Sequence, residues 1–346
     1  MRFPMNLRPG GTIGFLAPSF GCATEPYYSG FQNALKTFEK MGYQTILGPN
    51  CTEAKGVGIS NAPELCGKEV MDSFADPESN VLISCGGGEL MCEILDDVDF
   101  EQLKKLPAKW FMGYSDNTNL TFLLATLADT ASIYGPCAST FGMETWHPSL
   151  YDCMKILTGA SHTVKGYDLW EKESQKDEEH PLEPYHLTEK RELVLFPSEK
   201  QSVQMEGRLL GGCLDCLQGL VGTRFDRVKE FQENYKEDGI IWFLEACDLN
   251  VYSTRRALWQ MVHAGWFDSA KGFLIGRPRN GEELMGLNQY DAVLGAIGAL
   301  NVPVIMGVDI GHLPPMMPII VGSYAKVTVD GNNIQIDMKK DLHSEI

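Results

Sequence analysis

The chain has 346 residues, of which 44% are hydrophobic and 22% charged, as in an ordinary globular protein. Its 46 acidic and 29 basic residues give a formal net charge of -17 at pH 7. A field of this sign repels phosphate backbones and anionic membrane surfaces, so nucleic acids and membranes are not expected as partners. A small ligand that carries a positive charge stays compatible with it.

The N-terminal residues lack the apolar run of a secretory signal peptide, and no stretch approaches the ~20 apolar residues of a membrane span. The ten cysteines therefore do not predict a disulfide framework. Most of them, including Cys85, Cys92, Cys153 and Cys247, lie in apolar runs that are typical of buried, reduced thiols. Together these features predict a cytoplasmic protein.

The first 150 residues alternate short apolar runs with segments of helical periodicity, which predicts a parallel β-sheet flanked by helices. The expected strands are 11–18, 43–47, 81–85, 109–114 and 131–134. The expected helices are 31–38, 65–74, 89–95 and 117–128. Gly42 stands where the first helix would end.

The pattern changes between Lys165 and Arg191. Seven acidic residues, two lysines and Pro181 lie between Asp168 and Glu183, and Trp170 is the odd member of this segment. Such a composition predicts an exposed loop or linker, and a loop of this length in an enzyme is often a lid and otherwise flexible. We therefore expect a domain at 1–160, a linker at 161–192 and a second domain at 193–346.

The second domain is also expected to be α/β. Apolar runs predict strands at 202–209, 239–245, 272–275 and 303–308, and helical spacing predicts a helix through 214–220. Ser253 or Thr254 is expected to cap a helix that ends at His263. Asp330-Gly331 predicts the turn of a final hairpin.

Ser115 follows a predicted strand and precedes a predicted helix in Gly113-Tyr114-Ser115-Asp116-Asn117. Backbone N–H groups and the helix dipole favour negative charge at such a junction, which suits a serine nucleophile and its oxyanion. The segment resembles a nucleophile elbow, but Asn117 stands where G-x-S-x-G has its second glycine. The structural alternative is that Ser115 only caps the helix.

Gly86-Gly87-Gly88 also follows a predicted strand. Glycines there let the backbone approach a ligand closely, so their N–H groups are candidates for an oxyanion hole. A phosphate-binding loop and a plain tight turn are the alternatives, since the spacing matches neither G-x-G-x-x-G nor a P-loop.

Glu245 and His312 are the candidate orienting carboxylate and candidate base of the second domain. Glu245 ends an apolar strand, at the edge where ligand sites form in α/β proteins, and it could orient a histidine. Its alternative partners are Arg255 or the next helix. His312 follows a buried strand and precedes Pro314-Pro315, which fix the backbone after it. A purely structural role for His312 stays open.

Two cysteine features favour other chemistry. Cys213 and Cys216 form a C-x-x-C, which could serve redox chemistry or zinc, but no second pair exists and the neighbouring leucines predict a buried helix. Cys85 is a rival nucleophile that we expect to pack in the sheet.

As a set, these features resemble the LD-carboxypeptidase or S66 serine peptidases, which include the microcin C self-immunity hydrolases. The resemblance spans nearly the whole chain. Its markers are Gly11-Thr-Ile-Gly with Ala17-Pro18, Gly86-Gly87-Gly88, Gly113-Tyr114-Ser115-Asp116, Leu210-Gly211-Gly212, Leu244-Glu245 and Gly307-Val308-Asp309-Ile310-Gly311-His312.

The resemblance implies a Rossmann-like N-terminal domain, a smaller C-terminal α/β domain and an active site in the crevice between them. It implies a triad of Ser115, His312 and Glu245, with the oxyanion against the amide of Asp116 and an amide of Gly87 or Gly88. It implies no metal and no organic cofactor, and members of the family are commonly homodimers.

Two substrates are consistent with the resemblance. Murein carboxypeptidases of the family release D-alanine from a tetrapeptide, whereas the microcin-immunity branch cleaves an aminoacyl or peptidyl group from a nucleotide analogue with the help of an aromatic-bearing loop. The 165–191 segment is similar to that loop, and Trp170 could stack on an adenine. We favour the second branch, although the acidic segment would repel a phosphate. A non-catalytic protein that binds a small molecule is the alternative of another class.

Overall fold

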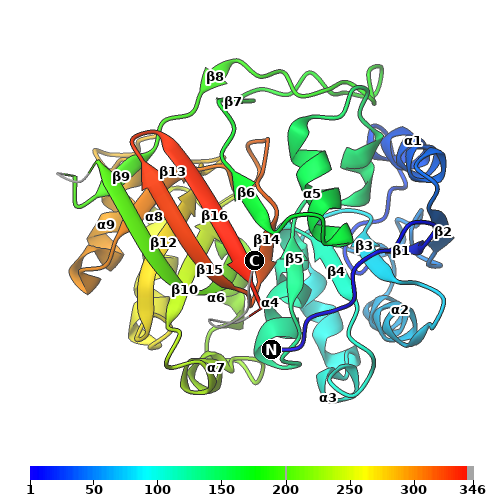
Figure 1. Cartoon of the computed structure of the whole chain (residues 1–346), viewed down its shortest axis with the longest axis horizontal. Helices are drawn as coiled ribbons and strands as arrows, with labels where there is room; N and C mark the ends of the chain where they lie inside the picture. Colours follow the sequence, from blue (N-terminus) through cyan, green and yellow to red (C-terminus); the bar gives the residue numbers. More distant parts are fainter. Residues whose placement is uncertain (199–200, 341–346) are drawn as a thin grey trace. The chain divides into compact units, whose positions relative to one another are not determined.

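The computed structural model describes residues 1–198 and 201–340. It forms two compact units, one of Met1–Ser161 with Glu173–His186 and one of His162–Lys172 with Leu187–Ile346 (Figure 1). The segment around 162–192 therefore contributes residues to both units. The boundaries 1–160, 161–192 and 193–346 stay a prediction about independent domains, and residues 199–200 and 341–346 of the last range lie outside the described residues.

The first unit is built on parallel strands in the order β5-β4-β3-β1-β2. Every residue of β3, β4 and β5 is buried, as expected for strands of a parallel sheet that is covered on both faces. The bounds are β1 Thr12–Leu16, β2 Gln44–Leu47, β3 Val81–Ser84, β4 Trp110–Gly113 and β5 Ser132–Tyr134.

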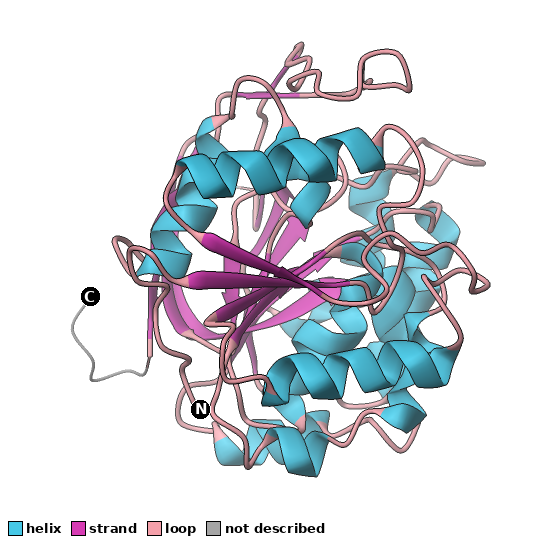
Figure 2. Ribbon diagram, turned by 90° about the vertical axis from the view of Figure 1, so that its right-hand side faces the viewer, coloured by secondary structure: helices cyan, strands magenta, loops and turns pink. Residues whose placement is uncertain are grey.

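Helices lie on both sides of this sheet. Figure 1 shows α1 and α5 on one side and α2, α3 and α4 on the other, and Figure 2 shows the strands running between the two layers. In α1, Phe31, Ala34 and Phe38 recur at helical spacing and are all fully buried. The bounds are α1 Tyr27–Lys40, α2 Pro63–Ala75, α3 Phe100–Leu103, α4 Thr118–Thr126 and α5 Pro148–Thr158, with 3₁₀ turns η1 Met91–Asp97, η2 Ser115–Asn117 and η3 Ala138–Gly142.

The second unit contains a mixed sheet in the order β6-β16-β15-β10-β11-β12-β13-β9. Its centre, β10 to β13, is parallel, and the strands on either side are antiparallel. The bounds are β6 Thr163–Lys165, β7 Leu169–Trp170, β8 Glu189–Lys190, β9 Val194–Phe196, β10 Ser202–Cys213, β11 Ile240–Glu245, β12 Ala270–Gly276, β13 Val304–Val308, β14 Ile319–Val321, β15 Tyr324–Asp330 and β16 Asn333–Lys339. Because parallel strands end at one edge, the residues that follow β11, β12 and β13 are neighbours in space.

The helices of this unit are α6 Leu214–Leu220, α7 Val228–Asn234, α8 Val251–His263 and α9 Gln289–Ile297, with the 3₁₀ turn η4 Gly298–Leu300. The expected cap of α8 was wrong, because Asn250 is the N-cap and its Oδ1 accepts the Ser253 amide at 3.0 Å. The predicted α/β fold with parallel strands is confirmed in both units. In the ranges 1–198 and 201–340, no helix has the length and apolar character needed to cross a membrane.

Candidate active site

Ser115 lies in the first unit, between the end of β4 and the start of α4. Its backbone adopts a φ of 62°, in the left-handed region that residues other than glycine rarely enter. Holding a serine there costs about 1–3 kcal/mol, and such strain concentrates at functional sites. The conformation is that of a sharp strand-to-helix elbow.

The alternative role of Ser115 as a helix cap does not fit this geometry. The N-cap of the short turn η2 is Tyr114, and the N-cap of α4 is Asn117. Ser115 is instead the first residue of the turn itself, and its amide donates to Oη of Tyr134 at 3.2 Å.

The glycine loop lies against Ser115. A Cβ atom added to Gly87 would be 3.0 Å from Cβ and 3.1 Å from Oγ of Ser115, so a side chain at this position would press on Ser115. The turn is tied to the loop by Asn117, whose Nδ2 donates to the Gly86 carbonyl at 2.7 Å. The helix expected at 89–95 is instead the 3₁₀ turn η1, which begins at Met91.

Asn117 occupies the position at which the usual elbow motif has its second glycine. A Cβ atom on Gly113 would lie 2.9 Å from Cβ of Asn117. The missing side chain at Gly113 therefore makes the space that Asn117 fills, which explains how the turn forms despite the departure from the motif.

The Asp116 carboxylate holds the turn η2 in place through hydrogen bonds. It accepts hydrogen bonds from Oγ of Ser19 at 2.5 Å and from the amide of Met91 at 2.9 Å, and Asn119 donates to it at 3.1 Å. Burial raises the pKa of Asp116 to about 6, although these hydrogen bonds act in the opposite direction. The side chain of Asp116 thus has a structural role, while the predicted oxyanion contact concerns its backbone amide.

Glu245 and His312 meet in the second unit. Nδ1 of His312 lies 2.9 Å from Oε2 of Glu245, and Glu245 is 1% exposed. The chain closes tightly around this carboxylate: a Cβ atom on Gly311, whose φ is +106°, would lie 2.5 Å from Oε2 of Glu245. Arg255, the alternative partner, donates to the carbonyl of Gly295 at 3.4 Å.

The electrostatics of the pair make His312 a stronger proton acceptor. Burial by itself lowers the pKa of His312, but the negative charge of Glu245 and the hydrogen bonds with Cys247 and Glu245 raise it well above its ordinary value. Because Nδ1 faces Glu245, proton exchange with a reacting group would pass through Nε2.

Trp170 makes more contacts within the protein than the sequence indicates, so less of it can contact a ligand. It lies in the short strand β7, which pairs with β8, and its indole Nε1 donates to the Lys190 carbonyl at 3.2 Å. The guanidinium of Arg277 lies over the ring, 5.0 Å from its centroid. Asp168 and Leu169 are exposed as expected, but the expectation of a loop was wrong for Leu169 and Trp170, which form a strand, and Glu171 is buried.

None of the ten cysteines, all of which lie within the described residues, forms a disulfide bond. A hydrogen bond with Cys216, together with burial, raises the pKa of the Cys213 thiol well above its ordinary value, and burial does the same for Cys85. Neither environment favours the thiolate that redox or nucleophilic chemistry needs. Cys92 is exposed and Cys247 is half-buried, which corrects the expectation that both are buried.

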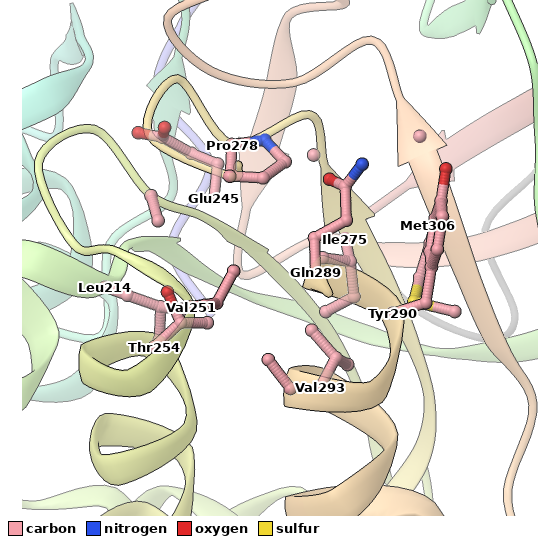
Figure 3. Close-up of a pocket in the computed structure, with 15 residues that line it drawn as sticks. Leu214, Glu245, Val251, Thr254, Ile275, Pro278, Gln289, Tyr290, Val293 and Met306 are labelled. Atoms are coloured by element: carbon pink, nitrogen blue, oxygen red, sulfur yellow. The ribbon is translucent and has the colours of Figure 1, made fainter. Parts of the chain in front are cut away.

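An apolar pocket with about 450 Å³ of space lies beneath the Glu245 backbone. Leu214, Ile275 and Met306 are among its walls, and Figure 3 shows the Glu245 carboxylate pointing away from these side chains. The carboxylate of Glu245 therefore faces His312 and not the pocket. Among the described residues, no group of three or more His, Cys, Asp or Glu side chains could hold a metal ion.

Two site residues escaped prediction. Arg277 directly follows β12, and Asp309 precedes His312; their side chains pair at 2.6 Å. Their positions immediately after buried strands were the available signal, because this edge also carries Glu245 and His312.

Comparison with known proteins identifies the family. The LD-carboxypeptidase N-terminal domain model matches residues 13–135, and the LD-carboxypeptidase C-terminal domain model matches residues 206–327. The chain belongs to the LD-carboxypeptidase (S66 peptidase) family. The predicted membership of this family is confirmed, and with it the prediction that the chain is a peptidase.

Relatives of this S66 peptidase include both branches of the resemblance. The microcin C7 self-immunity protein MccF of Escherichia coli is 25% identical over 345 residues, which cover 95% of this chain and 94% of MccF. The structure of MccF with aspartyl sulfamoyl adenosine matches with a TM-score of 0.80 at 21% identity and covers 98% and 99% of the two chains. That of muramoyltetrapeptide carboxypeptidase from Oxalobacter formigenes matches with a TM-score of 0.71 at 22% identity and covers 94% and 98%. At these identities the structural likeness establishes the fold.

Proposed function

We propose that this S66 peptidase cleaves an amide bond through a triad of Ser115, His312 and Glu245. The observation that carries the proposal is the 2.9 Å contact between Nδ1 of His312 and the buried Glu245 carboxylate. A carboxylate in this position fixes the tautomer and the orientation of a base and stabilises the imidazolium. The strained backbone of Ser115, beside Gly87, where a side chain would press on it, supports its role as nucleophile.

The roles define the reaction. His312 accepts the Ser115 proton as Oγ bonds to the carbonyl carbon, and the amides of Asp116 and of Gly87 or Gly88 stabilise the oxyanion. The imidazolium then protonates the leaving nitrogen as the C–N bond breaks, and water hydrolyses the acyl-enzyme. Losing one oxyanion donor lowers the rate by about 10²–10³-fold. These steps use no metal or organic cofactor.

For the substrate we propose an aminoacyl or peptidyl group linked to a nucleotide analogue. The support is the fold shared with MccF, whose structure contains aspartyl sulfamoyl adenosine. Trp170, whose ring also lies against Arg277, would stack on the base. We further propose that the active form is a cytoplasmic homodimer. Sedimentation of the purified chain tests whether it is a dimer.

A murein tetrapeptide is the second candidate substrate, with D-alanine as the released product. It is favoured by the acidity of the segment 168–183, which disfavours a phosphate near Trp170, and by the shared fold with muramoyltetrapeptide carboxypeptidase.

One experiment separates these possibilities. The purified chain is offered an aminoacyl sulfamoyl adenylate and a murein tetrapeptide side by side, and the products are identified by mass spectrometry. Ser115→Ala should abolish turnover and adduct formation with an acyl-trapping inhibitor, whereas Ser253→Ala, in α8, should retain both. A fully active Ser115→Ala variant refutes the triad. Deleting 171–181 should impair only the nucleotide-linked substrate if Trp170 has the proposed role.

A further inference from the structure

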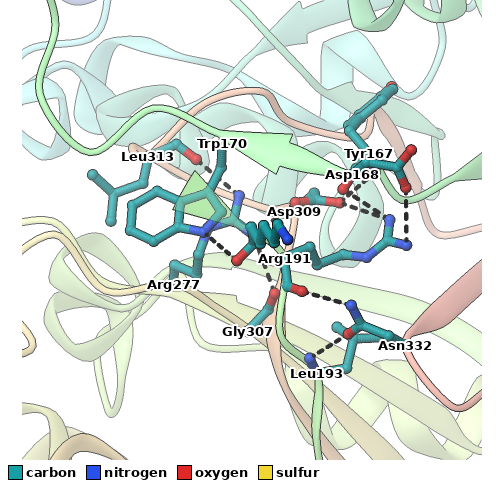
Figure 4. Close-up of polar contacts among 11 residues, drawn as sticks. Tyr167, Asp168, Trp170, Arg191, Leu193, Arg277, Gly307, Asp309, Leu313 and Asn332 are labelled. Atoms are coloured by element: carbon teal, nitrogen blue, oxygen red, sulfur yellow. Dashed lines mark hydrogen bonds and ion pairs between the residues drawn. The ribbon is translucent and has the colours of Figure 1, made fainter. Parts of the chain in front are cut away.

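A single guanidinium holds both ends of the turn that carries His312. Arg277 directly follows β12 and is 8% exposed. Its Nη1 donates to the Gly307 carbonyl at 3.1 Å and to Oδ1 of Asp309 at 2.6 Å, both before His312. Its Nη2 donates to the Leu313 carbonyl at 3.1 Å, directly after His312. We call these four residues, Arg277, Gly307, Asp309 and Leu313, the Arg277 brace (Figure 4).

The brace is also joined to the segment that carries Trp170. The second oxygen of Asp309 accepts the Tyr167 amide at 2.7 Å and lies 3.8 Å from Arg191, and Asp309 itself is fully buried. The guanidinium of Arg277 lies over the ring of Trp170, and the amide of Glu171 donates to the Pro314 carbonyl at 2.7 Å. Figure 4 shows Trp170 and Leu313 on the same side of Arg277.

These charges are held at an electrostatic cost. Burial lowers the pKa of Arg277 and raises that of Asp309, because each charged group loses water. A buried ion pair of this kind adds little net stability compared with apolar side chains of similar volume. An apolar pair, however, could not replace the planar guanidinium, which donates to two carbonyls and a carboxylate in fixed directions.

We propose that Arg277 is a positioning residue that sets His312 against Glu245 and links the turn of His312 to the Trp170 strand. The catalytic part of this inference rests on the proposed function. The positional part does not, because it concerns only the contact between His312 and Glu245.

The test compares Arg277→Lys with Arg208→Lys. Lysine keeps the charge but cannot bond three acceptors as a planar fork does. Arg208 is a matched control in the same sheet: it pairs with Asp238 at 2.5 Å, donates to the Gly322 carbonyl at 2.5 Å and lies 4.0 Å from the ring of Tyr235. Its partners belong neither to the His312 turn nor to the proposed triad.

The first measurement is the titration of the His312 imidazole by NMR on isotope-labelled histidine, with His312→Gln for assignment. Burial lowers the pKa of His312, but Glu245 and Cys247 raise it by more, so a ring that loses these two partners should titrate lower. We expect Arg277→Lys to lower the midpoint by about half a pH unit or more, and Arg208→Lys to leave it unchanged. Equal midpoints in the wild type and Arg277→Lys would overturn the proposal.

The second measurement is turnover. We expect Arg277→Lys to lower kcat by about 10–100-fold with a smaller change in KM, since a misplaced base affects the chemical step. Equal losses in both arginine variants would assign Arg277 a merely structural role. If Arg277→Lys does not fold, R277Q/D309N, which leaves no unpaired buried charge, replaces it with the same expected shift. A wild type that cleaves neither substrate but shows the expected NMR shift would refute the proposed function and support the positioning role.

Discussion

His312 and Glu245 meet at 2.9 Å although 67 positions separate them in the chain. Glu245 ends β11 and His312 lies in the turn after β13, and β12 lies between these two strands in the sheet. The pair is therefore set by the order of the strands and does not depend on a local motif.

Replacing the Glu245 carboxylate should reduce catalysis without removing the nucleophile. We expect Glu245→Gln to lower kcat by about 10³–10⁴-fold, because an amide no longer stabilises the imidazolium or its tautomer. The pKa of His312 should fall in the same variant, since the charge that raises it is gone. Steady-state kinetics and histidine NMR measure the two effects. Glu206→Gln, which removes a carboxylate that bonds Tyr324, is the control and should alter neither.

The glycine at position 87 should not tolerate a methyl group. In Gly87→Ala the new Cβ would press on Cβ and Oγ of Ser115, so we expect kcat to fall by about 10²-fold and the free energy of unfolding by about 1–3 kcal/mol. Gly219→Ala in α6 meets nothing within 4 Å and should be neutral or stabilising by up to ~1 kcal/mol. Urea unfolding and kinetics on both variants check this, and an active Gly87→Ala would contradict the packing.

Relieving the strained backbone should raise stability at the expense of function. Ser115→Gly and Ser115→Ala both lack the hydroxyl, but only glycine adopts a φ of 62° without strain. After allowance for the more flexible unfolded chain, we expect the glycine variant to be more stable by roughly 0.5–1 kcal/mol. At Ser253, in α8, the order should reverse, with glycine about 1 kcal/mol less stable than alanine. The same order at both positions would mean that Ser115 is unstrained.

Asp116 should make the fold less stable as the pH rises. Its pKa is raised from 3.8 to about 6, so the folded state binds its proton more tightly than the unfolded state does. The resulting stability is fully present below about pH 4 and is lost as the pH rises through about 6, at a total cost of about 3 kcal/mol, of which about 1 kcal/mol falls between about pH 5.2 and about pH 7. Urea unfolding at about pH 5.2 and about pH 7 should therefore show a larger decrease for the wild type than for Asp116→Asn. Parallel decreases would assign the pH dependence to other groups.

Candidate site residues could be predicted from the sequence where a reactive side chain directly follows a buried strand. Glu245 and His312 could be singled out because each follows an apolar run that had to be a buried strand, and strands of one parallel sheet end together. The Ser115 junction was found for the same reason. Its left-handed backbone was not predictable, because serine has no preference for that region and the surrounding structure imposes it.

Other features depend on contacts that one sequence does not display. An arginine after Gly276 is typical of an exposed strand end, yet Arg277 is buried because Asp309, 32 positions away, supplies the opposite charge. Asn250 caps α8 although Ser253 and Thr254 are equally good capping residues, since only tertiary packing decides where the helix begins. Trp170 was expected in an acidic loop, and strand pairing with Glu189 places it differently.

The Arg277 brace has a consequence for how such a peptidase changes over evolutionary time. Because one guanidinium touches both the Trp170 ring and the turn of His312, a substitution at either place alters the other. Substrate preference and catalytic geometry would then be inherited together. Relatives that lose the arginine should also have replaced the aromatic residue that lies against it, so the two positions are expected to covary among homologues.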